Sequence, residues 1–547
     1  MIQSNEFKKR VIYQIYPASF KDSNNDGRGD LKGIISKLDY LKDLGIGIIW
    51  LSPIYESPMD DMGYDISNYK KINPRFGTLD DFDELVLECK KRDILVVMDL
   101  VINHTSTEHE WFKEAIKDTN HNEYRDYYIF AKGKGKKMPN NWQSAFTGTC
   151  WKLIPGKKDT YYMHLFCDTQ ADLNYKNEKV IQEVESILKF WLDRGVYGFR
   201  CDVINNIYKT TLKNDYSKLI YNRGSKYYAN QPGMFDVLKR FRNDVLDKYD
   251  TFLIGETGII DKKIGNKLLN ERCLDIFFEF DHVYADKSKF IPIIKKKFKA
   301  KNFAKTILKW QNDVPWIANY LENHDQLRSV SRYGNDNKYH DESAKMLAIY
   351  LLTLRGTPFI FEGEEIGTKN ITNLKLSDSN DVAAHMAFDT VKKILPFKDE
   401  KIGKMINETI NRDHARTTMS WDNSINAGFN EGHKTWINLL SGDYQEINVK
   451  NEESNPNSIL SFYKKIIKFR NNDETIIFGD IKPEIISNKI VSYYRTSSKK
   501  NYLILLNFSD KKVKYDSILN LELVVSNYSE FKLEELPPYF GGIFEVN

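Results

Sequence analysis

The stretch Ile94-Leu-Val-Val-Met-Asp99-Leu-Val-Ile-Asn103-His104 combines an apolar run with polar residues at its C-terminal end. Three later apolar runs end in a similar way, at Arg200-Cys-Asp202, at Gly255-Glu256 and at Asn323-His324-Asp325. A short apolar run of this kind is typical of a strand that is buried on both faces. The pattern therefore predicts buried strands whose C-terminal ends carry carboxylates.

Eight such apolar runs occur along the chain, and helical patterns lie between most of them. One helical pattern covers residues 31–44 with Asp30 as its N-cap, another begins at Thr78, and a third covers 177–194 and ends at Gly195. Eight strand–helix units predict a (β/α)₈ (TIM) barrel, in which the active site lies at the C-terminal ends of the strands. The runs are 11–17, 46–54, 94–102, 198–204, 251–256, 274–281, 316–323 and 357–361.

The spacing of the runs predicts how the chain is divided into domains. Residues 105–175 are too many for one helical connection, so we expect an inserted domain that separates barrel residues 1–104 from barrel residues 176–475. A loop excursion at about 368–456 follows the eighth strand. Short alternating strands predict a C-terminal β-sandwich over residues 476–547.

Composition limits the class of protein. The 547 residues include 80 basic and 76 acidic side chains, and this near balance argues against a nucleic-acid partner. No apolar run approaches the length of a membrane span and the first residues form no apolar leader, so we expect a cytoplasmic protein without a membrane partner. Five widely spaced cysteines without a Cys-x-x-Cys motif suggest neither a zinc site nor a disulfide framework. The sequence leaves the oligomeric state open and is compatible with a monomer.

Carboxylates that converge at strand ends suit the cleavage of a glycosidic bond. One carboxylate must attack or stabilise a cationic sugar, and another must protonate the leaving oxygen. We therefore expect an enzyme that acts on a small oligosaccharide.

The motifs of the chain, taken in order, resemble those of the α-amylase family of retaining glycoside hydrolases and, within it, the oligo-1,6-glucosidase group. Any one motif is weak evidence, but together they span nearly the whole chain. The motifs are Tyr13-Gln-Ile-Tyr-Pro, Asp99 to His104, Gln170-Ala-Asp-Leu-Asn174, Gly198-Phe-Arg-Cys-Asp-Val-Ile, Ile254-Gly-Glu256 and Asn323-His-Asp-Gln.

The resemblance implies a catalytic role for three carboxylates. Asp202 matches the nucleophile, Glu256 matches the general acid/base, and Asp325 matches the carboxylate that grips sugar hydroxyls and favours the transition state. Arg200 lies two residues before Asp202, hence on the same side of the strand, and should lower the pKa of that carboxyl. Double displacement requires Asp202 and Glu256 to face each other at roughly 5–5.5 Å.

The resemblance also implies a set of residues that hold the terminal sugar. Arg416, rather than Arg412, is expected to pair with Asp61 and to block the far end of a sugar pocket, so that sugars are removed from a chain end. The expected substrate-binding residues are Asp61, Tyr64, His104, Phe146, Phe166, Arg200, His324 and Arg416.

Val203 bears on the linkage that is cleaved. In the family, a valine directly after the nucleophile accompanies cleavage of α-1,6 bonds, so we expect an exo-acting α-glucosidase of isomalto-oligosaccharides. Trehalose-6-phosphate hydrolase and sucrose isomerase remain alternatives on the same scaffold, and a non-catalytic binding protein is an alternative of another class. Substrate choice is left open by departures from the group's pattern at Ala18, Ala171, Leu327, Glu362, Thr418 and Ser420.

A short acidic loop predicts a structural metal ion. Residues 22–30 place oxygen donors at positions 1, 3, 5 and 9 and a possible backbone carbonyl at position 7, as an EF-hand loop does, but Gly33 replaces the closing glutamate at position 12. The loop resembles the family's calcium loop after the first strand, and calcium is expected rather than magnesium. The expected ligands are Asp22, Asn24, Asp26, Arg28 and Asp30.

Overall fold

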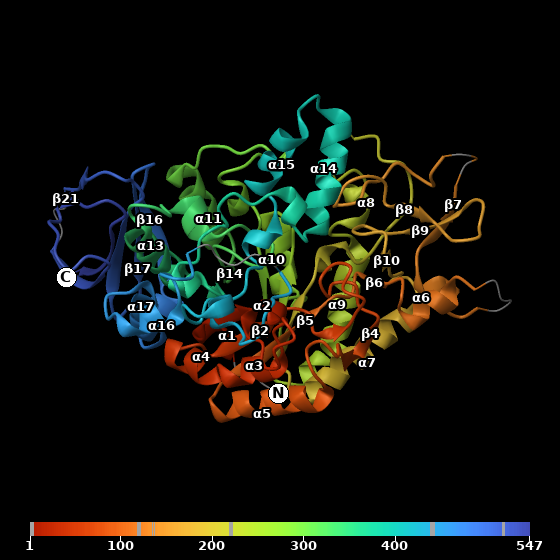
Figure 1. Cartoon of the computed structure of the whole chain (residues 1–547), viewed down its shortest axis with the longest axis horizontal. Helices are drawn as coiled ribbons and strands as arrows, with labels where there is room; N and C mark the ends of the chain where they lie inside the picture. The colour runs from red at the N-terminus through yellow and green to blue at the C-terminus, as the bar shows by residue number, and fades with distance from the viewer. Residues whose placement is uncertain are drawn as a thin grey trace.

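The computed structural model describes residues 5–117, 122–133, 135, 137–217, 222–437, 443–516 and 520–546. Eight parallel strands close a barrel at its centre, in the spatial order β1-β15-β14-β13-β12-β11-β5-β2 (Figure 1). Each of the eight predicted runs contains one of these strands, which confirms the barrel. The strands are β1 (Ile12–Ile15), β2 (Ile48–Leu51), β5 (Leu95–Leu100), β11 (Gly198–Cys201), β12 (Phe252–Glu256), β13 (Ile276–Phe278), β14 (Ala318–Asn319) and β15 (Thr357–Phe361).

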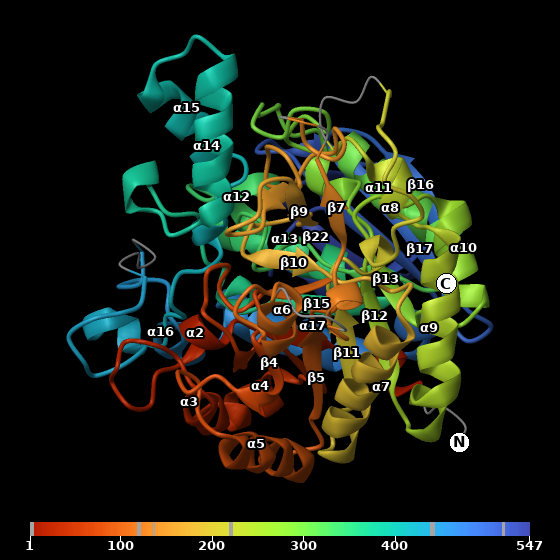
Figure 2. The same ribbon diagram turned by 90° about the vertical axis from the view of Figure 1, so that its right-hand side faces the viewer.

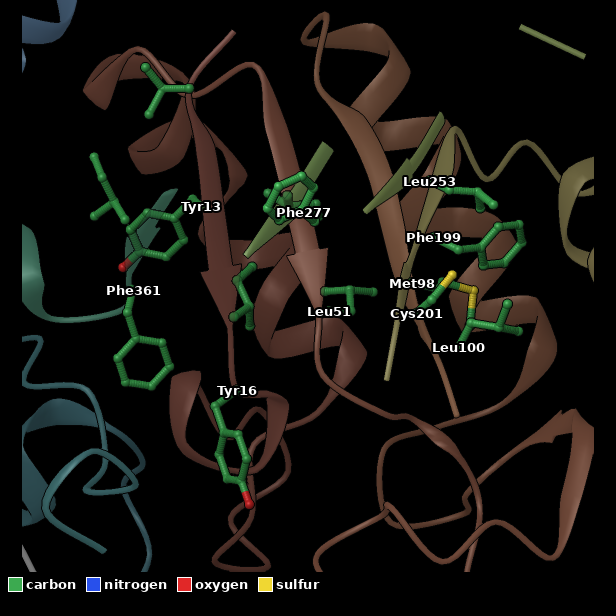
Figure 3. Close-up of a cluster of buried hydrophobic side chains, with 14 of the residues drawn as sticks. Tyr13, Tyr16, Leu51, Met98, Leu100, Phe199, Cys201, Leu253, Phe277 and Phe361 are labelled. Atoms are coloured by element: carbon green, nitrogen blue, oxygen red, sulfur yellow. The ribbon is translucent and has the colours of Figure 1, made fainter. Parts of the chain in front are cut away.

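Side chains alternate along the barrel strands between two apolar clusters. Val97 and Ile254 belong to the cluster inside the barrel, whereas Met98 belongs to the cluster between strands and helices (Figure 3). Because side chains two residues apart share one face of a strand, Asp99 and Glu256 follow Val97 and Ile254 on the inner side. The alternation thus directs the acidic groups at the strand ends toward the barrel axis.

The predicted helix starts are confirmed by side-chain caps. Asp30, Thr78 and Asn177 each accept a hydrogen bond from a backbone N–H of the first helical turn, which satisfies a donor that the helix leaves free. The single helix expected over 31–44 is two helices that separate at Lys37. The helices that surround the barrel include α3 (Leu31–Ser36), α4 (Leu38–Leu44), α5 (Leu79–Lys91), α7 (Glu178–Asp193), α9 (Pro232–Asp244), α10 (Lys262–Asn270), α11 (Ala300–Asp313), α13 (His340–Thr353) and α17 (Ile459–Asn471).

Two segments extend from the end of the barrel at which the strands have their C-termini. The segment between β5 and α7 forms a two-stranded and a three-stranded antiparallel sheet, on the right of Figure 1. The segment after β15 contains two helices that project from the barrel in Figure 2. The elements are β6 (His104–Ser106), α6 (Glu110–Ala115), β7 (Phe130–Lys132), β8 (Trp151–Leu153), β9 (Thr160–Met163) and β10 (Gln170–Asp172) in the first segment, and α14 (Val382–Ile394), α15 (Asp399–Asn407) and α16 (Val449–Ser454) in the second.

The C-terminal region is an antiparallel sheet of five strands in the order β16-β17-β18-β22-β20. One face of this sheet packs on α11 and α13, and its other face is covered by a two-stranded ribbon, β19 with β21. The second layer of the expected sandwich is therefore only this ribbon with its loops. The strands are β16 (Asp480–Ile486), β17 (Ile490–Thr496), β18 (Asn501–Asn507), β19 (Val513–Lys514), β20 (Leu521–Ser526), β21 (Glu535–Leu536) and β22 (Gly541–Val546).

All five cysteines are buried and none forms a disulfide. Among the residues that the structure describes, no helix has both the length and the apolar character that crossing a bilayer requires.

Candidate active site

Arg200 joins three carboxylates at the ends of three neighbouring strands. The parallel register places Arg200 of β11 beside Asp99 of β5 on one side and beside β12 on the other. Its guanidinium lies 2.7 Å from Asp99 Oδ1, 2.7 Å from Asp202 Oδ1 and 2.8 Å from Glu256 Oε2. All four side chains are buried. One cation thus faces three carboxyl groups, an arrangement in which one carboxyl readily keeps a proton.

The two predicted catalytic carboxyls both contact the Arg200 guanidinium, and burial raises the pKa of each. Burial raises the pKa of Asp202 to about 7, although Arg200 and a hydrogen bond with Glu256 lower it. Burial raises the pKa of Glu256 to about 8, against the effect of Arg200 and with a further rise from the negative charge of Asp202. The predicted sign of the Arg200 effect is therefore right, but burial outweighs it. Glu256 keeps its proton to a higher pH than Asp202 does.

Val203, directly after Asp202, adopts an unusual backbone conformation. Its φ of 37° lies in the left-handed region, which is a genuine outlier for a β-branched residue. In this conformation the backbone N–H of Val203 donates to Glu256 Oε2 at 2.9 Å. The strained turn therefore links the chain after the predicted nucleophile to the predicted acid/base.

His324 lies between two polar side chains after β14. Its Nδ1 is 2.7 Å from Gln14 Nε2, its Nε2 is 2.7 Å from the Tyr64 hydroxyl, and its ring stacks on Tyr64 at 5.3 Å between centroids. Because the Gln14 amide nitrogen can only donate, Nδ1 accepts and the ring proton lies on Nε2. Burial lowers the pKa of His324 to about 3, so the ring is neutral.

The pairing of the two arginines corrects a prediction. Arg412, not Arg416, contacts Asp61, with 3.1 Å between Nη2 and Oδ1. Asp381 decides this choice because its buried carboxylate accepts from the backbone N–H and the guanidinium of Arg412 and directs that side chain toward Asp61. Arg416 instead donates to the backbone oxygen of His324 and lies 3.0 Å from Asp325. The expected Arg416–Asp61 pair was therefore wrong.

Asp325 is surrounded by these cations. Burial alone would raise its pKa, but the Arg412 and Arg416 guanidiniums, which are charged at neutral pH, hold the pKa of this carboxyl well below its ordinary value. The Asp325 side chain is 30% exposed, the largest exposure among the three predicted catalytic carboxylates. Asp325 is thus an ionised acceptor that solvent and small molecules can reach.

The inserted segment contributes aromatic rings beside this cluster. The ring of Phe166 lies 5.4 Å from that of His104 and 5.5 Å from that of Phe146. The Arg412 guanidinium lies 5.4 Å from the Phe146 ring, and the Gln170 amide contacts Asp61 at 3.2 Å. The inserted segment and the barrel therefore meet at the predicted sugar-binding residues.

Comparison with models of known protein families identifies the family of this chain. The model of the α-amylase catalytic domain matches residues 14–479, which include every one of the predicted catalytic residues. The chain belongs to the α-amylase family.

Relatives within the α-amylase family resemble the chain over nearly its whole length. The oligo-1,6-glucosidase of Parageobacillus thermoglucosidasius is 43% identical over 545 residues, which are 97% of this chain and 96% of that protein. Among solved structures, isomaltulose synthase from Klebsiella sp. LX3 superposes with a TM-score of 0.95 at 34% identity, covering 99% of both chains. Trehalose-6-phosphate hydrolase from Bacillus licheniformis superposes with a TM-score of 0.91 at 36% identity, again over 99% of both chains.

Three residues of this α-amylase family site were not among the predicted site residues. Asp99 could have been found, because it opens the strand-end motif and Arg200 needs a partner on the neighbouring strand. Arg412 lies outside the predicted set because Arg416, four residues later, was the expected partner of Asp61. Asp381 has no local signal, since it meets Arg412 across 31 residues of chain.

The predicted calcium loop is held together by hydrogen bonds. Asp22 accepts from the backbone N–H groups of Asn24, Asn25 and Gly27, and Asp30 accepts from Ser23 while it caps α3. Within the described part of the chain, no three His, Cys, Asp or Glu side chains are grouped as a metal site requires. The donors are nevertheless all oxygen atoms, as calcium prefers. Calcium binding by the loop stays a prediction.

Proposed function

We propose that the chain is a retaining, exo-acting α-glucosidase that hydrolyses α-1,6 bonds at the non-reducing end of isomalto-oligosaccharides. The observation that carries the proposal is the pair Asp202 and Glu256, which share the Arg200 guanidinium at 2.7 and 2.8 Å. A pair of facing carboxyls, one more acidic than the other, supplies both the nucleophile and the proton donor of double displacement.

The mechanism assigns each carboxyl one role in each half-reaction. In the first, an ionised Asp202 oxygen bonds to the anomeric carbon while Glu256 donates its proton to the leaving glycosidic oxygen. In the second, Glu256 takes a proton from water, whose oxygen displaces Asp202 from the sugar. Arg200 keeps the Asp202 carboxyl oriented in both steps, as the nucleophile in the first and as the leaving group in the second, and Asp325 accepts hydrogen bonds from sugar hydroxyls.

The Asp61–Arg412 pair supports the exo mode of action. Both side chains are buried, and Asp381 and Phe146 hold the guanidinium in place. This fixed ion pair lies beside the residues predicted to bind the terminal sugar. In the proposal it blocks an oligosaccharide from extending past that sugar. In this proposal Arg412 has the blocking role that was expected of Arg416.

Val203 supports the α-1,6 preference. Val203→Thr is expected to shift the ratio of kcat/KM values for isomaltose and maltose toward maltose by about 10-fold, the size of effect that one methyl-sized change beside a substrate produces. The measurement is the ratio for the purified variant against wild type. An unchanged ratio would remove Val203 from the specificity argument. Val203→Ile, which keeps an apolar β-branched side chain, is the matched control and should retain the isomaltose preference.

A substrate panel tests the function directly. Initial rates on isomaltose, panose, maltose, sucrose and trehalose 6-phosphate should be highest for the two α-1,6 substrates, isomaltose and panose. A higher rate on trehalose 6-phosphate would replace the proposal by the phosphorylated alternative, and conversion of sucrose into an isomer would replace it by isomerase activity. Absence of hydrolysis on the whole panel would favour a non-catalytic protein.

We also propose a structural calcium ion at residues 22–30. What supports it is the oxygen-only donor set and the position of the loop directly before α3, remote in sequence from the predicted catalytic groups. An ion that binds only the folded protein raises its thermal stability. The midpoint of heat unfolding should fall in excess chelator and return when calcium is added back; an identical midpoint with and without chelator would count against the ion.

We propose, finally, a cytoplasmic enzyme. Five buried cysteines without a disulfide fit a reducing compartment. Fractionation of cells that express the protein tests the location, and recovery of the activity outside the cells would contradict it.

A further inference from the structure

A buried ion pair close to the active site has no part in the mechanism above. Lys209 lies seven residues after Asp202 on the loop that follows β11, and Asp172 ends β10 of the inserted segment. Lys209 Nζ is 2.5 Å from Asp172 Oδ1, and both side chains are almost completely buried. Lysine and aspartate are rarely buried unless they are paired, so the pair requires an explanation.

Lys209 has a second acceptor, the side chain of Asn103 at the end of β5. Lys209 Nζ donates to Asn103 Oδ1 at 2.9 Å. The amide nitrogen of Asn103 then lies on the opposite side, where it donates to Asp172 Oδ1 at 3.0 Å and lies 3.2 Å from His104 Nδ1. A reversed amide would place its N–H groups against the ammonium and its oxygen against the carboxylate. The ion pair therefore determines which way the Asn103 amide points.

The orientation of Asn103 in turn determines where His104 carries its proton. Burial lowers the pKa of His104, so the ring is neutral and has a single N–H. Because the Asn103 amide nitrogen donates to Nδ1, the ring proton lies on Nε2, which is 3.0 Å from the backbone oxygen of Tyr64. This N–H therefore donates to the backbone oxygen of Tyr64, a residue predicted to bind the terminal sugar.

We propose that the Lys209–Asp172 pair is a positioning device that, through Asn103, holds His104 in the Nε2–H tautomer, so that His104 donates to the backbone oxygen of Tyr64 and fixes that residue beside the terminal sugar. Lys209 and Asp172 do not touch the substrate in this inference; they act through His104. The inference rests on the proposed function, because it takes Tyr64 to contact the terminal sugar. It adds to that function a defined link between the inserted segment, the loop after the nucleophile and the sugar site.

Removal of both charges of the Lys209–Asp172 pair distinguishes an effect on the position of His104 from an effect on folding. Lys209→Met alone leaves the Asp172 carboxylate buried without its cation and can prevent folding. The double variant Lys209→Met/Asp172→Asn removes both charges at similar volume. It should fold with a near-wild-type unfolding midpoint and lose about 10- to 100-fold in kcat/KM for isomaltose, as the loss of an orienting partner does elsewhere.

A double-mutant cycle with His104 tests whether the effect passes through that residue. The two substitutions Lys209→Met and Asp172→Asn are introduced together into the wild-type protein and into the His104→Ala variant. If the pair acts by positioning His104, its 10- to 100-fold cost should shrink to less than about threefold in the His104→Ala background, because the group it positions is already absent. An equal cost in both backgrounds, or no cost in wild type, would overturn the inference.

A second ion pair, also in the segment between β11 and α9, supplies the control. Lys226 lies 2.8 Å from the buried carboxylate of Asp215, and neither residue contacts His104 in the described structure. Lys226→Met/Asp215→Asn should change kcat/KM by less than about twofold. A loss as large as that of the Lys209 variant would mean that any ion pair in this segment matters, and would overturn the specific role of Lys209.

The tautomer itself is measurable on the unmodified protein, whatever the variants do. Long-range ¹H–¹⁵N spectra of enzyme with ¹⁵N-labelled histidine should show the His104 proton on Nε2. The His104 signal is assigned as the one that disappears in the His104→Ala variant. If the enzyme hydrolyses isomaltose but its His104 proton lies on Nδ1, the inference is overturned and the proposed function stands. An enzyme inactive on every α-glucoside tested would instead mean failure of the proposed function.

Discussion

Asp202→Asn is expected to lower kcat for isomaltose by about 10³-fold or more, the scale of loss when a covalent nucleophile is removed. The amide has no charge with which to attack the anomeric carbon, so the covalent intermediate cannot form. The fold should persist, because Arg200 keeps Asp99 and Glu256 as partners and the amide has nearly the volume of the carboxyl. Single-turnover assays measure the loss, and the heat-unfolding midpoint checks the fold.

An exposed aspartate provides the control for this variant. Asp83 lies on the exposed side of α5 and pairs with Arg194 at the surface, so Asp83→Asn should leave kcat unchanged. Substantial hydrolysis by Asp202→Asn, at a level above what trace wild-type contamination explains, would refute the nucleophile assignment. Retained hydrolysis would also remove the basis for assigning Glu256 as the partner group.

Glu256→Gln is expected to reduce kcat/KM for isomaltose by about 10²- to 10⁴-fold, the contribution of a positioned general acid. The amide cannot protonate the leaving sugar oxygen. An aryl glucoside with an acidic leaving group needs little protonation, so its bond cleavage should be reduced far less. The measurement is the ratio of the two losses; equal losses for both substrates would contradict an acid role for Glu256.

The pH profile distinguishes the same two carboxyls. In wild type, kcat/KM should fall as the pH drops below about 7, because Asp202 takes up a proton, and should fall again above about 8, because Glu256 loses its proton. Glu256→Gln should lose the fall on the alkaline side and keep the fall on the acid side. A variant that keeps the alkaline fall would assign it to another group.

The strand-end motifs made the barrel and its main carboxyls predictable. In a run such as Leu253-Ile-Gly-Glu256, the apolar residues predict a buried strand. The period-two alternation of side chains then predicts which side chain faces the barrel axis at the strand end. The same alternation puts Arg200 and Asp202 on one face. These are local properties of the chain, and the structure brings their carboxyls together as expected.

Contacts between distant segments were not predictable in the same way. Arg412 and Arg416 are four residues apart, equally basic and both buried, so the sequence offers no means of choosing which one reaches Asp61. Asp381, at the start of a helix in the excursion after β15, makes that choice by binding Arg412. Asn103 and Asp172 likewise meet only because β10 pairs with β6, which begins directly after Asn103, and Lys209 reaches both from the loop after β11.

The sequence by itself determined the eight-stranded barrel and the strand ends at which Asp202 and Glu256 lie, because burial and alternation act within a few residues of each strand. Only the tertiary structure decided which cation pairs with which carboxylate and how far burial raises the pKa of each carboxyl. Those outcomes depend on desolvation and on charges brought together from remote parts of the chain, and no local pattern records them.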